Sequence, residues 1–83
     1  MNLSEERERG AKASALLKNP LFTDALNIIR SSYFDAWRNS VSADSKEREH
    51  YWALFNAVDE FEGHLTNVLK TGEMAEKQIF NQN

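Results

Sequence analysis

Residues 19–39 read NPLFTDALNIIRSSYFDAWRN, and this stretch decides the fold. Asparagine is a good helix N-cap and proline fits the first helical position, so Asn19 and Pro20 predict a helix start. Apolar residues then recur at spacings of three and four, namely Phe22, Ala25, Leu26, Ile29, Tyr33, Ala36 and Trp37. Three more widen this stripe: Leu21, Ile28 and Phe34. The stretch therefore predicts a helix over 20–39 that packs against more than one neighbour.

The flanking sequence predicts three further helices, over about residues 3–18, 45–71 and 73–80. Asn2 is a candidate N-cap of the first of these, and either Asp44, together with Glu47, or Ser45 alone is a candidate N-cap of the second. Gly72 resembles the glycine that commonly ends a helix, so it is expected to separate the last two. Gly10 weakens the first helix by about 1 kcal/mol relative to alanine. Since charged residues precede it, the first half of that helix is expected to be solvated.

The predicted fold class is all-α. The chain has only three glycines and one proline, and no stretch alternates polar and apolar residues long enough for a strand. The short polar connection between helices 20–39 and 45–71 requires them to run antiparallel. We therefore expect a single domain over 1–83, a small helical bundle built on a long antiparallel hairpin with shorter flanking N- and C-terminal helices.

Composition excludes several classes of protein. The chain has 83 residues, a net charge of −3 and no cysteine, which excludes a disulfide scaffold, cysteine-ligated zinc and thiol catalysis. No apolar run is long enough for a transmembrane helix, so no membrane partner is expected. The negative charge argues against a protein whose main task is coating nucleic acid.

The hairpin helices carry more apolar surface than they can bury against each other. We expect four large residues to face another chain: Trp52, Phe61, Leu21 and Phe34. Because small cores commonly need help from assembly, a homo-oligomer is the favoured interpretation. A compact monomeric bundle in which all helices close one core is the alternative. Trp37 is assigned to the core in either case.

No catalytic, cofactor or metal site is predicted. Glu47 and His50 have the Glu-x-x-His spacing of di-iron bundles, but they lie in a charged first turn and the motif does not recur. An acidic patch surrounds Gly63 and consists of Asp59, Glu60, Glu62 and His64. One exposed helix face supplies no cleft and no converging groups for acid–base chemistry.

Basic residues are concentrated near the start of the sequence. Arg7, Arg9 and Lys12 could contact phosphate, because with Lys18 they give residues 1–18 a charge of +1. The alternative is pairing on a wet helix surface at i,i+4, as between Glu8 and Lys12. DNA binding is therefore considered but not favoured.

Four segments of the sequence resemble a group of short, acidic, helical proteins encoded in tailed bacteriophages and prophages, among head and DNA-packaging genes. They are Arg9-Gly10 with Leu16-Leu17-Lys18-Asn19-Pro20-Leu21-Phe22, Tyr33 with Ala36-Trp37-Arg38, Arg48-Glu49 with Trp52, and His64-Leu65 with Thr71-Gly72. The resemblance covers roughly residues 8–79 and implies a role in virion assembly, in the host cytoplasm during infection or in the virion itself. It assigns no residue a chemical role.

The leading hypothesis is a non-enzymatic phage protein that oligomerises and docks to other phage proteins in head morphogenesis or DNA packaging. One alternative is a small terminase-like subunit, a ring that binds viral DNA. Another is an inhibitor of a host protein, in which the acidic helix imitates nucleic-acid charge.

Overall fold

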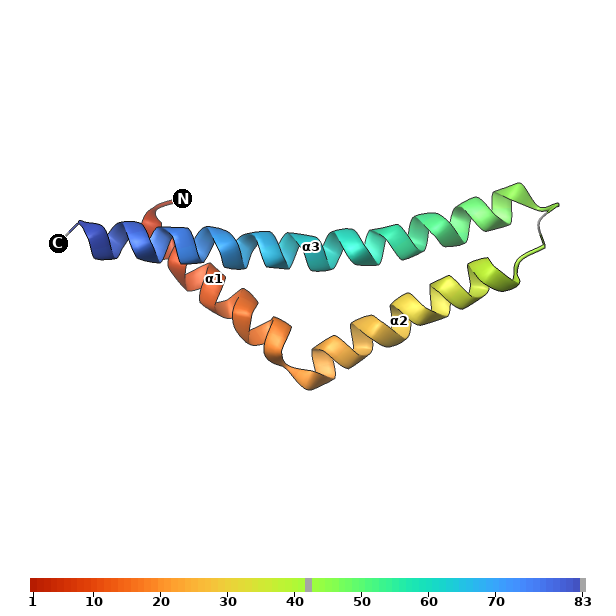
Figure 1. Cartoon of the computed structure of the whole chain (residues 1–83), viewed down its shortest axis with the longest axis horizontal. Helices are drawn as coiled ribbons and strands as arrows, with labels where there is room; N and C mark the ends of the chain where they lie inside the picture. The colour runs from red at the N-terminus through yellow and green to blue at the C-terminus, as the bar shows by residue number, and fades with distance from the viewer. Residues whose placement is uncertain (42, 83) are drawn as a thin grey trace.

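The computed structural model describes residues 1–41 and 43–82, and this part of the chain forms three α-helices and no strand (Figure 1). Helix α1 spans Leu3–Lys18, α2 spans Pro20–Asn39 and α3 spans Ser45–Asn81. The chain is all-α, and the predicted bounds of the first two helices are confirmed. Ser42 of the predicted connection and Asn83 at the end lie outside the described residues.

Each helix begins at a side chain that caps it, as the sequence predicts. The caps are Asn2, which accepts from the Glu5 N–H at 2.8 Å, Asn19, which accepts from the Leu21 N–H at 2.9 Å, and Asp44, which accepts from the Glu47 N–H at 3.1 Å. Pro20 occupies the first turn of α2, where its missing N–H costs nothing.

The predicted helix end at Gly72 is wrong, and no separate helix covers 73–80. Helix α3 continues through Gly72 to Asn81, so it has 37 residues and is about 55 Å long. A glycine that ends a helix usually turns into the left-handed region, whereas Gly72 keeps helical backbone. Its small size serves a tertiary contact instead.

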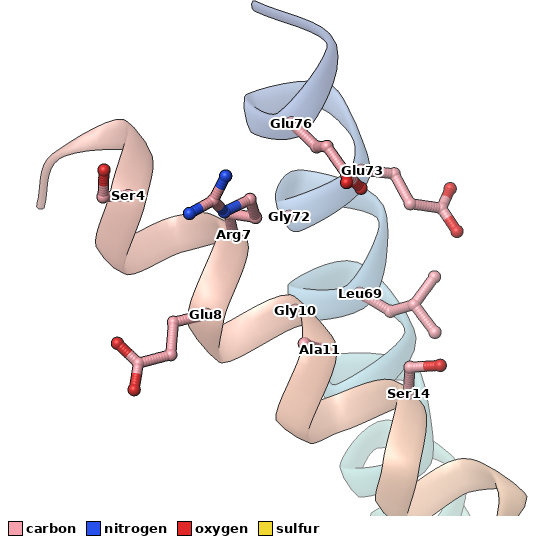
Figure 2. Close-up of a pocket in the computed structure, with 10 residues that line it drawn as sticks. All are labelled: Ser4, Arg7, Glu8, Gly10, Ala11, Ser14, Leu69, Gly72, Glu73 and Glu76. Carbon is pink, nitrogen blue, oxygen red and sulfur yellow. The ribbon is translucent and has the colours of Figure 1, made fainter. Parts of the chain in front are cut away.

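Gly72 and Gly10 allow α1 and α3 to touch backbone to backbone, as Figure 2 shows. A Cβ atom on Gly10 would lie 2.7 Å from the Gly72 Cα. One on Gly72 would lie 2.6 Å from the Gly10 Cα and 2.9 Å from the carbonyl oxygen of Glu6. These separations are shorter than two carbon or carbon and oxygen atoms tolerate, so each position accepts only glycine without a shift of the helices.

Two alanines extend this contact by one turn on each helix. Ala13 lies three residues after Gly10 and Ala75 three after Gly72, and their exposed fractions are only 3% and 1%. We call these four residues the glycine crossing. Residues 3–9 of α1 are exposed or half-buried, as expected for the first half of this helix, whereas Gly10 at the end of that stretch is buried against α3.

The remaining packing follows from a sharp elbow between α1 and α2. In Figure 1 the two helices diverge from Asn19 and Pro20, and each returns to a different half of α3. α1 meets the C-terminal half at the glycine crossing, and α2 runs antiparallel to the N-terminal half as the predicted hairpin. Leu26 anchors α2 with 8% of its surface exposed, and it is the only large apolar side chain that is buried among the described residues.

This arrangement leaves the molecule elongated. Its dimensions are 62 × 23 × 15 Å, and its radius of gyration is 17.6 Å, where a compact chain of this length has about 12 Å. Its accessible surface of 6236 Å² exceeds by about 1,100 Å² the area of a compact monomer of equal mass. None of the described helices combines the length and the apolar character that crossing a membrane requires.

Candidate functional site

The predicted acidic patch on α3 is occupied by a cation from α2. Arg30 donates from Nε to Asp59 at 2.7 Å and from a terminal nitrogen to Glu62 at 2.9 Å. Its other terminal nitrogen donates to the Asn27 side chain at 2.7 Å. The hydrogen bond that Arg30 donates to Glu62, followed by the one it donates to Asp59, raises the pKa of its guanidinium above its usual range. A raised pKa keeps Arg30 cationic at every pH below that range.

This three-way contact makes Asp59 and Glu62 structural residues that hold the hairpin together. Among the described residues, no group of three or more histidine, cysteine or acidic side chains could hold a metal ion. The Arg30 contact therefore gives the patch a physical role that requires no ligand.

Replacing Arg30 with methionine should lower the free energy of unfolding by about 1 kcal/mol, because both carboxylates are part-exposed and water replaces some of the lost interaction. Lys12→Met is the matched control, since the Lys12–Glu8 pair at 3.5 Å is largely exposed on one helix. Its removal should change the stability by less than about 0.5 kcal/mol in urea titrations. Equal losses in the two variants would contradict a special role for Arg30.

Aromatic side chains gather where α2 and α3 approach the connection between them. Trp37 and Trp52 lie 5.4 Å apart between ring centroids, Phe34 lies 5.9 Å from Phe55, and Trp52 stacks on Phe55 at 5.5 Å. We call these four residues the hairpin-end cluster. Trp52 is 46% and Phe34 40% exposed, so one side of the cluster faces solvent.

Arg48 fixes the position of this cluster. Its guanidinium carbon lies 4.7 Å from the centroid of the Trp37 ring, a cation–π contact. One terminal nitrogen also donates to the carbonyl oxygens of Trp37 and Ser40, at 3.3 and 3.2 Å. The Trp37 carbonyl also accepts from the Ser40 N–H at 3.2 Å, so Arg48 adds a second contact that ties the end of α2 to the start of α3. Sequence reasoning assigned no role to Arg48.

The structure does not bring the four predicted interface residues into one patch. Trp52 and Phe34 belong to the hairpin-end cluster, whereas Phe61 packs beside Phe22 with ring centroids 6.3 Å apart. Phe61 and Trp52 are nine residues apart, which is two and a half turns, so they leave opposite sides of α3. Leu21 lies near the elbow and is 80% exposed. All four carry large exposed surface, distributed over several faces.

The three basic residues considered for phosphate contact are also dispersed. Arg7 and Glu8 line a hollow beside the glycine crossing together with Glu73 and Glu76 of α3, so acids offset the cation there (Figure 2). Arg9 lies about 200° farther round α1 and donates to the Met1 sulfur at 3.6 Å.

Lys12 pairs with Glu8 at 3.5 Å. This is the i,i+4 contact that the sequence suggests as the alternative to phosphate binding. No single basic face results from the three side chains. The hollow in Figure 2 contains a mixture of both charges, and histidine is absent from its lining.

Comparison with protein-family models, with curated proteins and with solved structures finds no match to this chain. The exposed surfaces of the molecule are therefore the basis for inferring its function.

Proposed function

We propose that this chain is a non-enzymatic assembly protein that acts by oligomerising and by docking to other proteins through its helix faces. The observation that carries the proposal is its surface, about 1,100 Å² larger than that of a compact monomer. A stable protein–protein interface covers about 800 Å² on each partner, so the excess matches what one such contact would bury.

The chemistry of the exposed residues supports the same proposal. Tryptophan and arginine are enriched among the residues that dominate binding energy at interfaces. In the hairpin-end cluster, Arg48 holds Trp37 in place and the neighbouring Trp52 is 46% exposed. The aromatic side chains pay little additional entropy on binding because their ring contacts already order them. This cluster is the surface we assign to a heterologous protein partner.

The sequence resemblance supplies the biological setting of the proposal. It favours a part in head morphogenesis or DNA packaging of a tailed bacteriophage. A protein in that role needs surfaces that bind neighbouring subunits, and the elongated shape presents them along 62 Å. The protein would act in the host cytoplasm while particles form.

Light scattering on a dilution series tests the assembly directly. We expect a discrete molar mass that is a multiple of 9.6 kDa at micromolar concentrations and that falls on dilution. A mass of one chain over the whole range would contradict self-assembly. Adding duplex DNA at low salt should leave the mass unchanged. A salt-sensitive complex would instead point to the terminase-like alternative, because phosphate contacts release counterions.

A further inference from the structure

The outer face of α2 carries a stripe of alternating large apolar and small residues that no part of the described chain covers. Its members are Leu21, Ala25, Ile28 and Ser32, at spacings of four, three and four, and we call them the α2 outer stripe. Leu21 and Ile28 are 80% and 66% exposed. Ile28 lies about 200° round the helix from Leu26, the residue that anchors α2 on α3, so the stripe points away from the molecule.

We propose that the α2 outer stripe binds the same stripe of a second copy of this chain, with the two α2 helices antiparallel about a twofold axis. This inference rests on the proposed assembly function and names its surface and symmetry. The two copies meet with the axis between residues 26 and 27. Position 21 of one copy then faces position 32 of the other, and position 25 faces position 28.

The alternation of side-chain size along the stripe carries the choice of direction. The antiparallel register sets Leu21 against Ser32 and Ile28 against Ala25, so a large side chain meets a small one at every level. A parallel pair would set leucine against leucine and alanine against alanine, and the helices could not keep an even separation. Parallel pairing would also place Asp35, seven residues after Ile28, directly against its own copy.

The surface of α2 contains the receiving holes for this packing. A shallow hollow on the helix is lined by Asp24, Asn27, Ile28, Ser31, Ser32 and Asp35. They form two overlapping sets with the spacing i, i+3, i+4 and i+7, and the second set begins at Ile28. Four residues at this spacing surround a hole into which a side chain of a facing helix inserts. In the antiparallel register, Leu21 of the second copy lies over the set centred on Ser31 and Ser32, and Ala25 over the set before it.

Single-cysteine variants test the register, since the chain has no cysteine of its own. Ala25→Cys carrying a mass tag is mixed with untagged Ile28→Cys under a glutathione redox buffer. The 25–28 disulfide between copies should exceed the 25–25 and 28–28 products at least about fivefold, because only facing positions meet the Cα separation of a disulfide, about 4.4–6.8 Å. Met74→Cys, on α3 and 63% exposed, controls for random collision.

A charge on the stripe tests the contact itself. Ile28→Asp should raise the dissociation constant of the dimer about 100-fold, because two carboxylates would lose water at the interface. Its circular dichroism should stay unchanged, since Ile28 is exposed in the single chain. Met74→Asp is the matched control and should leave the dissociation constant within about twofold.

Each result separates this inference from the broader proposal. An assembled protein that links 25 to 25 and 28 to 28, or that links Met74→Cys equally well, overturns the antiparallel stripe and leaves the assembly function standing. An assembled protein that is unaffected by Ile28→Asp also overturns it. A protein that is a single chain at all concentrations overturns both.

Discussion

Replacing Gly72 with alanine should lower the free energy of unfolding by about 2–3 kcal/mol, although alanine is the better helix former. The added Cβ would lie 2.6 Å from the Gly10 Cα and 2.9 Å from the Glu6 carbonyl oxygen. Both neighbours are backbone atoms, so no side-chain rotation relieves the overlap and the two helices must separate. Separation in turn loosens the packing of Ala13 and Ala75. Chemical denaturation followed by circular dichroism measures the loss.

Gly63→Ala is the matched control because it makes the same chemical change in the same helix. A Cβ at Gly63 would meet no atom within 4 Å. Alanine there should therefore raise the free energy of unfolding by about 0.5–1 kcal/mol through helix propensity alone. Opposite signs for the two variants would confirm the close approach of α1 and α3. A stabilised Gly72→Ala protein would mean that the helices do not cross there.

Replacing Leu26 with alanine should cost about 2–4 kcal/mol of unfolding free energy. Leu26 is 8% exposed at the contact of α2 with α3, and truncation would leave a cavity that the thin hairpin has few side chains to fill. With total stability small for a chain of this size, the variant should be partly unfolded at 37 °C. Thermal melting at concentrations where wild type is a single species measures the effect.

Met74→Ala provides the comparison for Leu26→Ala, since Met74 is 63% exposed on α3. Its truncation removes a side chain that already contacts water, so the stability should change by less than about 0.5 kcal/mol. A loss at Leu26 no larger than that at Met74 would show that the hairpin contact contributes little to the fold.

The local signals in the sequence were sufficient to place the helix starts and the hairpin. Asn2, Asn19 and Asp44 act within three residues of themselves, and hydrogen bonds of that range are visible in a one-dimensional pattern. Gly72 could not be interpreted in the same way. A glycine that ends a helix and one that receives a neighbouring backbone look alike until its partner 62 positions away is known.

For the candidate site, the exposure of the four interface residues could be predicted, and their contact with another chain stays a prediction. Exposure of Trp52, Phe61, Leu21 and Phe34 agrees with the expectation that they lie outside a core, but their distribution over opposite faces depends on how α2 lies on α3. The contacts between α2 and α3 that sequence reasoning missed could have been found from the register of the hairpin, that is, from which residues face each other once the turning point is chosen. Trp37 and Trp52, Phe34 and Phe55, and Arg30 and Asp59 lie at equal distances on either side of the same point in the connection.

The elbow at Asn19 and Pro20 has a consequence for the order of folding. The hairpin joins residues close in sequence, such as Trp37 and Trp52, whereas the glycine crossing joins Gly10 to Gly72 across most of the chain. Closing the longer loop costs more entropy, so the hairpin should form first. With α2 and α3 in place, α1 has only to swing about the elbow until the two glycines meet. Local opening of the folded protein should retrace that swing, releasing α1 while the hairpin stays closed.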